Sequence, residues 1–83
     1  MVNEVLEFKL VGENASAVEY EYYPEGDKKA KGLVSFSKKD GRPVIIELSP
    51  SDDMKMYAGM LFKRLRQFHE TNAYKAQGKV IWY

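Results

Sequence analysis

The spacing of the apolar residues changes at about residue 49, and this change limits the folds that the chain can adopt. Before that point, apolar residues recur at every second position in several short segments, which is typical of half-buried strands. From Met54 to Phe68 they recur at every third or fourth position, which is typical of an amphipathic helix. An all-helical or an all-strand fold would satisfy only one part of this pattern. The sequence therefore predicts an α+β domain.

Strands are expected in the first half of the chain, at residues 4–11, 17–23, 33–37 and 44–48. Turn-forming residues separate them, notably PEGD at 24–27 and KDGR at 39–42, so successive strands are predicted to pair as an antiparallel meander. The side chains expected on the buried face are Leu6, Phe8, Leu10, Val18, Tyr20, Tyr22, Val34, Phe36, Val44, Ile46 and Leu48. Those expected on the open, polar face are Glu7, Lys9, Glu19, Glu21, Ser35, Ser37 and Glu47.

One helix is expected to begin near residue 50 and to end near residue 71. Ser49 is the predicted N-cap, Pro50 the first helical residue, and Asp52 a negative charge near the positive end of the helix dipole. Asn72 or Gly78 is expected to terminate the helix. The predicted apolar stripe consists of Met54, Tyr57, Ala58, Leu61, Phe62, Leu65 and Phe68.

Residues 79–83 (KVIWY) are β-branched and aromatic, and they are predicted to form a last short strand. We expect this strand to pair with the first one; a place beside the fourth is the alternative. The predicted fold is then a four-stranded antiparallel meander, one amphipathic helix packed on one face and a short C-terminal strand (ββββαβ), in two layers. A chain of 83 residues has room for one hydrophobic core, so a single domain spanning residues 1–83 is expected.

The composition excludes several classes of protein. Cysteine is absent, so the chain can form neither disulfides nor thiolate metal sites, which fits a cytoplasmic location. The first residues include acidic side chains and no long apolar run, so no signal peptide is predicted. No segment approaches the ~18 consecutive apolar residues of a membrane span, and we expect no association with membranes.

Residues that would support catalysis are few. Glu19 and Glu21 are expected on the open face of the sheet, whereas paired catalytic carboxylates need a cleft that raises the pKa of one of them. His69 is the single histidine, and no metal-binding spacing surrounds it. The glycines form neither a GxGxxG motif nor a P-loop. We therefore expect a non-enzymatic protein that needs no cofactor and no metal.

Positive and negative charges are unevenly distributed along the chain. Residues 1–27 contain seven acidic residues and one basic residue, a net charge of −6, whereas residues 28–83 contain twelve basic and five acidic residues, a net charge of +7. Clustered lysines and arginines can bind phosphate groups, so a nucleic-acid-binding accessory protein is the alternative function. The sequence pI, however, is well below the basic range typical of such modules. The candidate contacts are Lys28, Lys29, Lys31, Lys63, Arg64 and Arg66.

Protein binding, to another protein or to a second copy of the chain, is the function that the sequence favours. Met56 and Met60 are four residues apart and outside the apolar stripe of the helix, where methionines can form an adaptable contact patch. Tyr23 is expected to face outward beside the turn at Pro24. Tyr83 is expected on the open face of the last strand, whose edge can also accept an added strand. These two methionines and two tyrosines are the candidate partner contacts.

Overall fold

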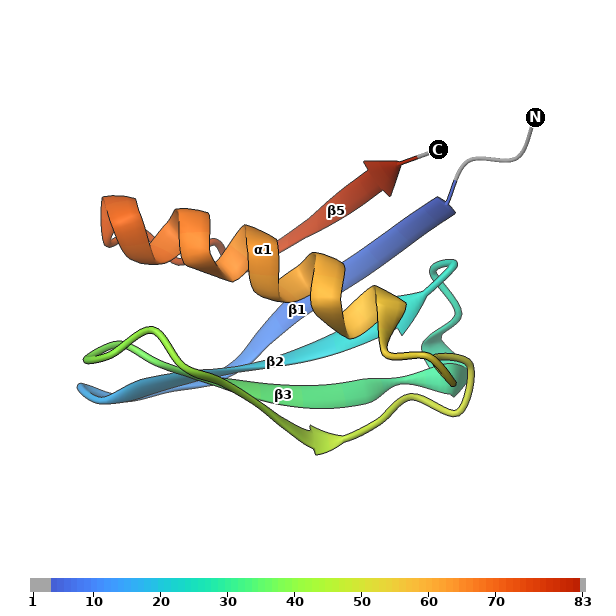
Figure 1. Ribbon diagram of the computed structural model, residues 1–83, viewed down its shortest axis with the longest axis horizontal. Coiled ribbons are helices and arrows are strands. Elements are labelled where there is room, and N and C mark those ends of the chain that lie inside the picture. Colours follow the sequence, from blue (N-terminus) through green and yellow to red (C-terminus); the bar gives the residue numbers. More distant parts are fainter. Residues whose placement is uncertain (1–3, 83) are drawn as a thin grey trace.

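The computed structural model describes residues 4–82 and contains one antiparallel sheet with a helix lying across one face (Figure 1). The elements follow in the order ββββαβ, so the predicted two-layer α+β fold is confirmed. Their bounds are β1 (Glu4–Glu13), β2 (Ala17–Pro24), the short 3-10 helix η1 (Lys28–Ala30), β3 (Gly32–Ser37), β4 (Pro43–Glu47), α1 (Met56–Thr71) and β5 (Gln77–Trp82).

The strands are arranged in the order β4-β3-β2-β1-β5, so the last strand pairs with the first, as expected. In the antiparallel register of β5 against β1, Val80 lies opposite Leu6 and Ile81 lies opposite Val5. Val80 is buried and Ile81 is exposed, because successive side chains of a strand point to opposite faces. β4 and β5 each have a single neighbour and form the two edges of the sheet.

The hydrophobic core lies between α1 and the sheet, where the helix packs most closely on β1, β2 and β5. Tyr20 and Tyr22 are fully buried in it, as predicted. The Tyr20 hydroxyl donates to the Lys75 carbonyl at 2.6 Å, and the Tyr22 hydroxyl donates to Asp52 Oδ2 at 3.2 Å. Among the described residues no buried side-chain polar atom lacks a hydrogen-bond partner. The core consists of Leu6, Phe8, Val18, Tyr20, Tyr22, Val34, Phe36, Tyr57, Ala58, Leu61, Leu65, Phe68 and Val80.

The orientation of β4 differs from the prediction. The sequence analysis places Val44, Ile46 and Leu48 in the core, and this is wrong, because all three side chains are exposed to solvent. Ile45, which alternates with Val44 and Ile46 and so points to the opposite face from them, packs against the core instead. The edge strand therefore carries more exposed apolar surface than the sequence indicates.

The length of the β3–β4 turn explains the error. The Ser37 N–H donates to the Arg42 carbonyl at 3.0 Å, so these residues close a loop that consists of residues 38–41. With an even number of loop residues, Ile45 lies opposite Val34, and both side chains face the helix. Residues 44–46 are all apolar, so their sequence contains no alternation that identifies the buried face.

The start of α1 also differs from the prediction. The helix begins at Met56 instead of near residue 50, and Lys55 precedes it in the left-handed conformation, with φ 59°. The intervening segment forms turns, closed by N–H groups of Asp52 and Lys55 that donate to carbonyls three residues earlier. Met54 therefore does not join the apolar stripe of the helix; 87% of it is exposed.

Asp52 takes the capping role that the sequence analysis assigns to Ser49. Its buried carboxylate accepts hydrogen bonds from the N–H of Tyr57 at 3.0 Å and from the N–H of Ala58 at 2.9 Å. These are among the helix N–H groups that have no partner within the helix itself. The Ser49 hydroxyl instead donates to the Ala30 carbonyl, which ties the turn to η1. Asn72, in the left-handed conformation, ends the helix as predicted.

No helix within residues 4–82 has both the length and the apolar character needed to cross a bilayer.

Candidate functional site

The three described residues among the predicted partner contacts are not brought together. Met56 is exposed, whereas Met60 is half-buried and packs against the core, so the two methionines do not form one exposed patch. Tyr23 is buried, with 6% of its surface accessible, so it does not offer the exposed surface that the sequence predicts beside the turn. Tyr83 lies outside the described residues. Of the three members that the structure describes, only Met56 offers an exposed apolar side chain.

Tyr23 lies on the open face but is covered by charged neighbours. Its hydroxyl donates to Glu21 Oε1 at 2.6 Å, and Lys28 Nζ lies 4.0 Å from the centre of its ring. The hydroxyl, helped by the nearby Lys31, holds the pKa of the Glu21 carboxyl below its ordinary value. The sequence does not predict this burial, because it depends on the turn after β2, which brings Lys28 back over the ring.

Burial of three tyrosines is expected to make the free energy of unfolding depend on pH. It raises the pKa of Tyr20, Tyr22 and Tyr23 from 10.0 to about 12. The folded state thus keeps these phenolic protons at a pH where the unfolded state loses them, so unfolding is favoured as pH rises. We expect the free energy of unfolding to fall between pH 10 and about 12. Urea unfolding followed by circular dichroism across this range measures the fall. Ionisation of all tyrosines near pH 10 in the folded protein, followed by absorbance, would contradict it.

Two of the predicted phosphate contacts are paired with carboxylates of the sheet. Lys28 Nζ lies 3.0 Å from Glu7 Oε1, and Lys31 Nζ lies 3.6 Å from Glu21 Oε2. These carboxylates belong to the open face of β1 and β2, so the loop lysines are drawn toward acidic neighbours. Lys29 is exposed in the same loop.

The remaining predicted phosphate contacts lie on α1. Lys63 and Arg66 are exposed, and Arg64 is half-buried. None of these three side chains takes part in the ion pairs found among residues 4–82.

Two shallow cavities lie on the open face. The larger, of about 250 Å³, is lined by acidic, basic and two aromatic residues: Glu7, Phe8, Lys9, Tyr23, Lys28, Gln77, Gly78 and Lys79. The smaller, of about 110 Å³, lies between β2, β3 and β4 and includes Glu21, Lys31 and Glu47. Neither cavity contains a histidine. Their charged side chains are largely those already engaged in the ion pairs of the loop lysines.

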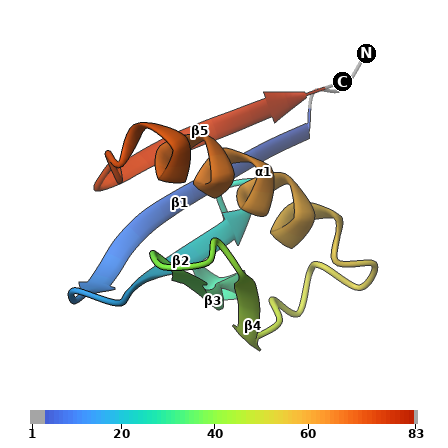
Figure 2. The ribbon, with the colours of Figure 1, turned by 60° about the vertical axis from the view of Figure 1, so that its left-hand side comes forward.

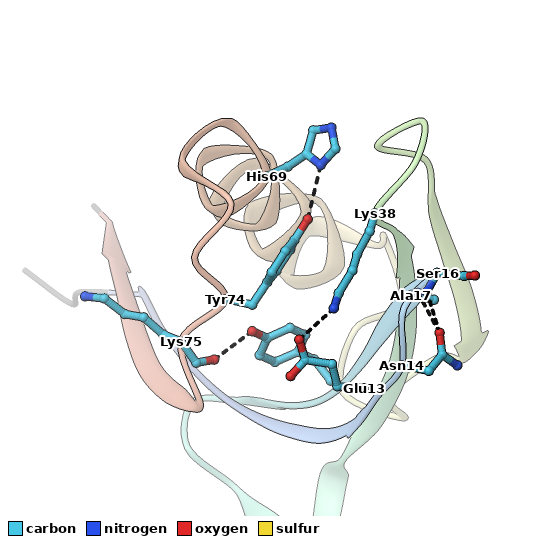
Figure 3. Close-up of polar contacts among 9 residues, drawn as sticks. Glu13, Asn14, Ser16, Ala17, Lys38, His69, Tyr74 and Lys75 are labelled. Atoms are coloured by element: carbon cyan, nitrogen blue, oxygen red, sulfur yellow. Dashed lines mark hydrogen bonds and ion pairs between the residues drawn. The ribbon is translucent and has the colours of Figure 1, made fainter.

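His69 belongs to an aromatic group at the end of α1. Its Nδ1 lies 3.1 Å from the Tyr74 hydroxyl (Figure 3). Its ring also packs edge-on against Phe36. Lys38 lies over the Tyr74 ring at 5.7 Å and forms an ion pair with Glu13 at 2.7 Å. These contacts join the helix end to the β3–β4 turn. Among the described residues no group of three or more His, Asp or Glu side chains is arranged to hold a metal ion.

The exposed edge strand β4 is the surface feature that sequence analysis misses. Exposed fractions are 57% for Val44 and 51% for Ile46, and Leu48 is also exposed just after the strand. Figure 2 shows β4 at the margin of the sheet, away from β5 and from the part that the helix covers. Met54 and Met56 add exposed apolar side chains in the segment that leads from β4 into α1. The even length of the β3–β4 loop is the sequence signal that would identify this surface.

The outer backbone of β4 has hydrogen-bonding groups that face away from β3. The Arg42 carbonyl points toward β3, since it accepts from Ser37. In an antiparallel ladder the N–H and C=O of one residue point to the same side, and successive residues alternate. The N–H and C=O of Val44, which lies opposite Ser35, therefore point toward β3. The N–H and C=O of Ile45 point outward, away from β3. This edge combines apolar side chains with free backbone donors and acceptors.

Comparison of the chain with protein-family models, with curated proteins and with solved structures finds no match. A function has to be inferred from the residues themselves.

Proposed function

We propose that this chain is a non-enzymatic protein-interaction domain that binds its partner along the edge strand β4. The observation that carries the proposal is the exposure of Val44 and Ile46 on a strand with one open edge. An extended segment of a partner can hydrogen-bond to such an edge while its side chains contact the exposed apolar residues. Buried at an interface, each of these side chains would contribute roughly 1–2 kcal/mol.

The two edges of the sheet differ in a way that supports this choice. Proteins protect exposed edge strands with charged residues, lysine above all, because open edges invite pairing with other chains. β5 has the exposed Lys79 within the strand. β4 has the sequence PVIIE, with apolar residues at its three central positions and no basic residue. Of the two edges, β4 has the more apolar central residues and no lysine, which makes it the more suitable for a partner.

Site-specific photo-crosslinking tests the proposal. Val44 is replaced by photoreactive p-benzoylphenylalanine in cells that express the chain at its natural level, and Gln67, exposed on α1, receives the same replacement as a control. We expect protein adducts from position 44 and none from position 67. The further substitution Ile46→Lys should remove the adducts, because a lysine at an open edge opposes strand addition. Equal adducts from both positions, or none from position 44, would contradict the proposal.

Nucleic-acid binding, the alternative, has less support. Lys28 and Lys31 are already paired with Glu7 and Glu21, so carboxylates of the open face balance their charges. Phosphate contacts would have to come mainly from the helix residues Lys63, Arg64 and Arg66. No observed feature orients these three side chains toward a common ligand.

A further inference from the structure

We propose that β4 pairs antiparallel with β4 of a second copy of this chain, around a two-fold axis that passes beside Ile45. The inference rests on the proposed function, because it names the partner of the same edge. It depends on three features of the edge: the direction of its backbone groups, the position of its apolar side chains, and the charges at its two ends.

The backbone places the centre of the pairing at Ile45. The N–H and C=O of this residue point away from β3, as the alternation from Arg42 requires. Two antiparallel copies centred here would exchange two hydrogen bonds between their Ile45 residues. Val44 of one copy would then lie opposite Ile46 of the second copy, so the exposed apolar side chains would cover one another.

The charges at the ends of β4 favour the antiparallel arrangement. Arg42 precedes the strand and Glu47 ends it. The Arg42 side chain is 83% exposed, with Asp40 at 3.8 Å as its ion-pair partner, and Glu47 is exposed and takes no part in the ion pairs described within residues 4–82. Antiparallel pairing brings Arg42 of each copy close to Glu47 of the other. Parallel pairing would instead place like charges side by side.

Pro43 and the register shift limit the pairing to a short ladder. Pro43 has no N–H, so the ladder gains no donor at that end of the strand. The register of β3 against β4 shifts between Leu33 and Val34, which leaves an extra residue in β4 at Ile46. A two-fold pairing also uses the same edge of both copies, so it closes as a dimer and leaves the β5 edges outermost.

A charge-exchange experiment tests this pairing. Sedimentation velocity is measured at chain concentrations from about 10 μM to about 1 mM. These concentrations are chosen because the interface lies at the small end of the range for specific complexes, where association is weak. We expect reversible dimerisation of the unmodified chain. Arg42→Glu or Glu47→Arg alone should weaken it by about tenfold, because two attractive pairs per dimer become repulsive. The double variant Arg42→Glu/Glu47→Arg should dimerise again, and an equimolar mixture of the two single variants should form a heterodimer.

Two further variants control for the change in net charge. Lys39→Glu changes the charge of the β3–β4 turn as Arg42→Glu does, and Glu70→Arg reverses an exposed acidic residue on α1; neither should alter dimerisation. A chain that is monomeric at about 1 mM, or a dimer that the double variant fails to restore, would overturn the inference. If position 44 crosslinks only to a different protein, the proposed function stands and the second copy is not its partner. If position 44 gives no adducts at all, the proposed function fails as well.

Discussion

Replacing Asp52 by alanine is expected to lower the free energy of unfolding by about 3 kcal/mol, through the loss of a helix cap and of a buried acceptor. Asp52 is 2% exposed and accepts hydrogen bonds from the N–H groups of Tyr57 and Ala58 and from the Tyr22 hydroxyl. Alanine leaves these donors buried without their acceptor. Urea unfolding followed by circular dichroism measures the change.

Two neighbouring variants make this prediction specific. Asp53→Ala, next in the chain and exposed, should change the free energy of unfolding by less than about 0.5 kcal/mol. Asp52→Asn keeps one acceptor oxygen, so its effect should be about half as large and remains measurable if the alanine variant does not fold. Equal effects of Asp52→Ala and Asp53→Ala would show that the buried carboxylate does not stabilise the helix start.

Gly32→Ala is expected to destabilise the protein by about 3 kcal/mol, at the upper end of the usual cost of overpacking a core. A methyl group at this position would lie 2.2 Å from Tyr22 Cε1 and 2.8 Å from the Ser49 backbone nitrogen. Neither neighbour can move freely. The Tyr22 hydroxyl bonds to Asp52 and accepts from the Ser49 N–H at 3.0 Å, so ring and turn hold each other in place.

The control is the same substitution at Gly59, which lies in α1 with nothing within 4 Å of the added carbon. Gly59→Ala should raise the free energy of unfolding by up to about 1 kcal/mol, because alanine favours the helix more than glycine does. Thermal or urea unfolding of the two variants should therefore give changes of opposite sign. If both variants destabilise equally, the close approach of Tyr22 to Gly32 is not what limits this position.

The order and class of the elements could be predicted because each strongly periodic segment carries its own signal. Leu6 and Phe8 alternate with charged residues, and Leu61, Leu65 and Phe68 follow the helical repeat. These signals are local, and the structure confirms the elements that they predict. The pairing of β5 with β1 is the preferred one of two placements that topology leaves open, and the structure confirms it.

The errors lie where a local pattern leaves two arrangements equally possible. Residues 44–46 are uniformly apolar, so only the length of the preceding loop decides that Ile45 is buried. Ser49 and Asp52 both match the residues preferred at a helix start. The Ser49 hydroxyl is engaged by the distant Ala30 carbonyl, so Asp52 caps the helix. The length of an adjacent loop decides the first case, and a partner far away in the chain decides the second.

The candidate site could be predicted only in part, because the contacts of its residues depend on how separate segments of the chain pack together. Lys28 and Lys31 are identifiable as a basic cluster, but their pairing with Glu7 and Glu21 depends on the register of β1 and β2. The sequence identifies Tyr23 as an open-face residue, but it does not indicate that Lys28 covers its ring. Interaction by protein contacts remains the preferred function, although the surface moves from the predicted methionine patch to β4.

The four-residue turn between Ser37 and Arg42 has a consequence for how such a surface can be gained or lost in evolution. Because side chains alternate along a strand, inserting or deleting one residue in the turn would rotate β4 by half a turn against the sheet. Val44 and Ile46 would then enter the core, and Ile45 would face solvent. Inserting or deleting a single codon in this surface loop, with no change in the strand itself, would therefore exchange the exposed and the buried apolar residues of this edge.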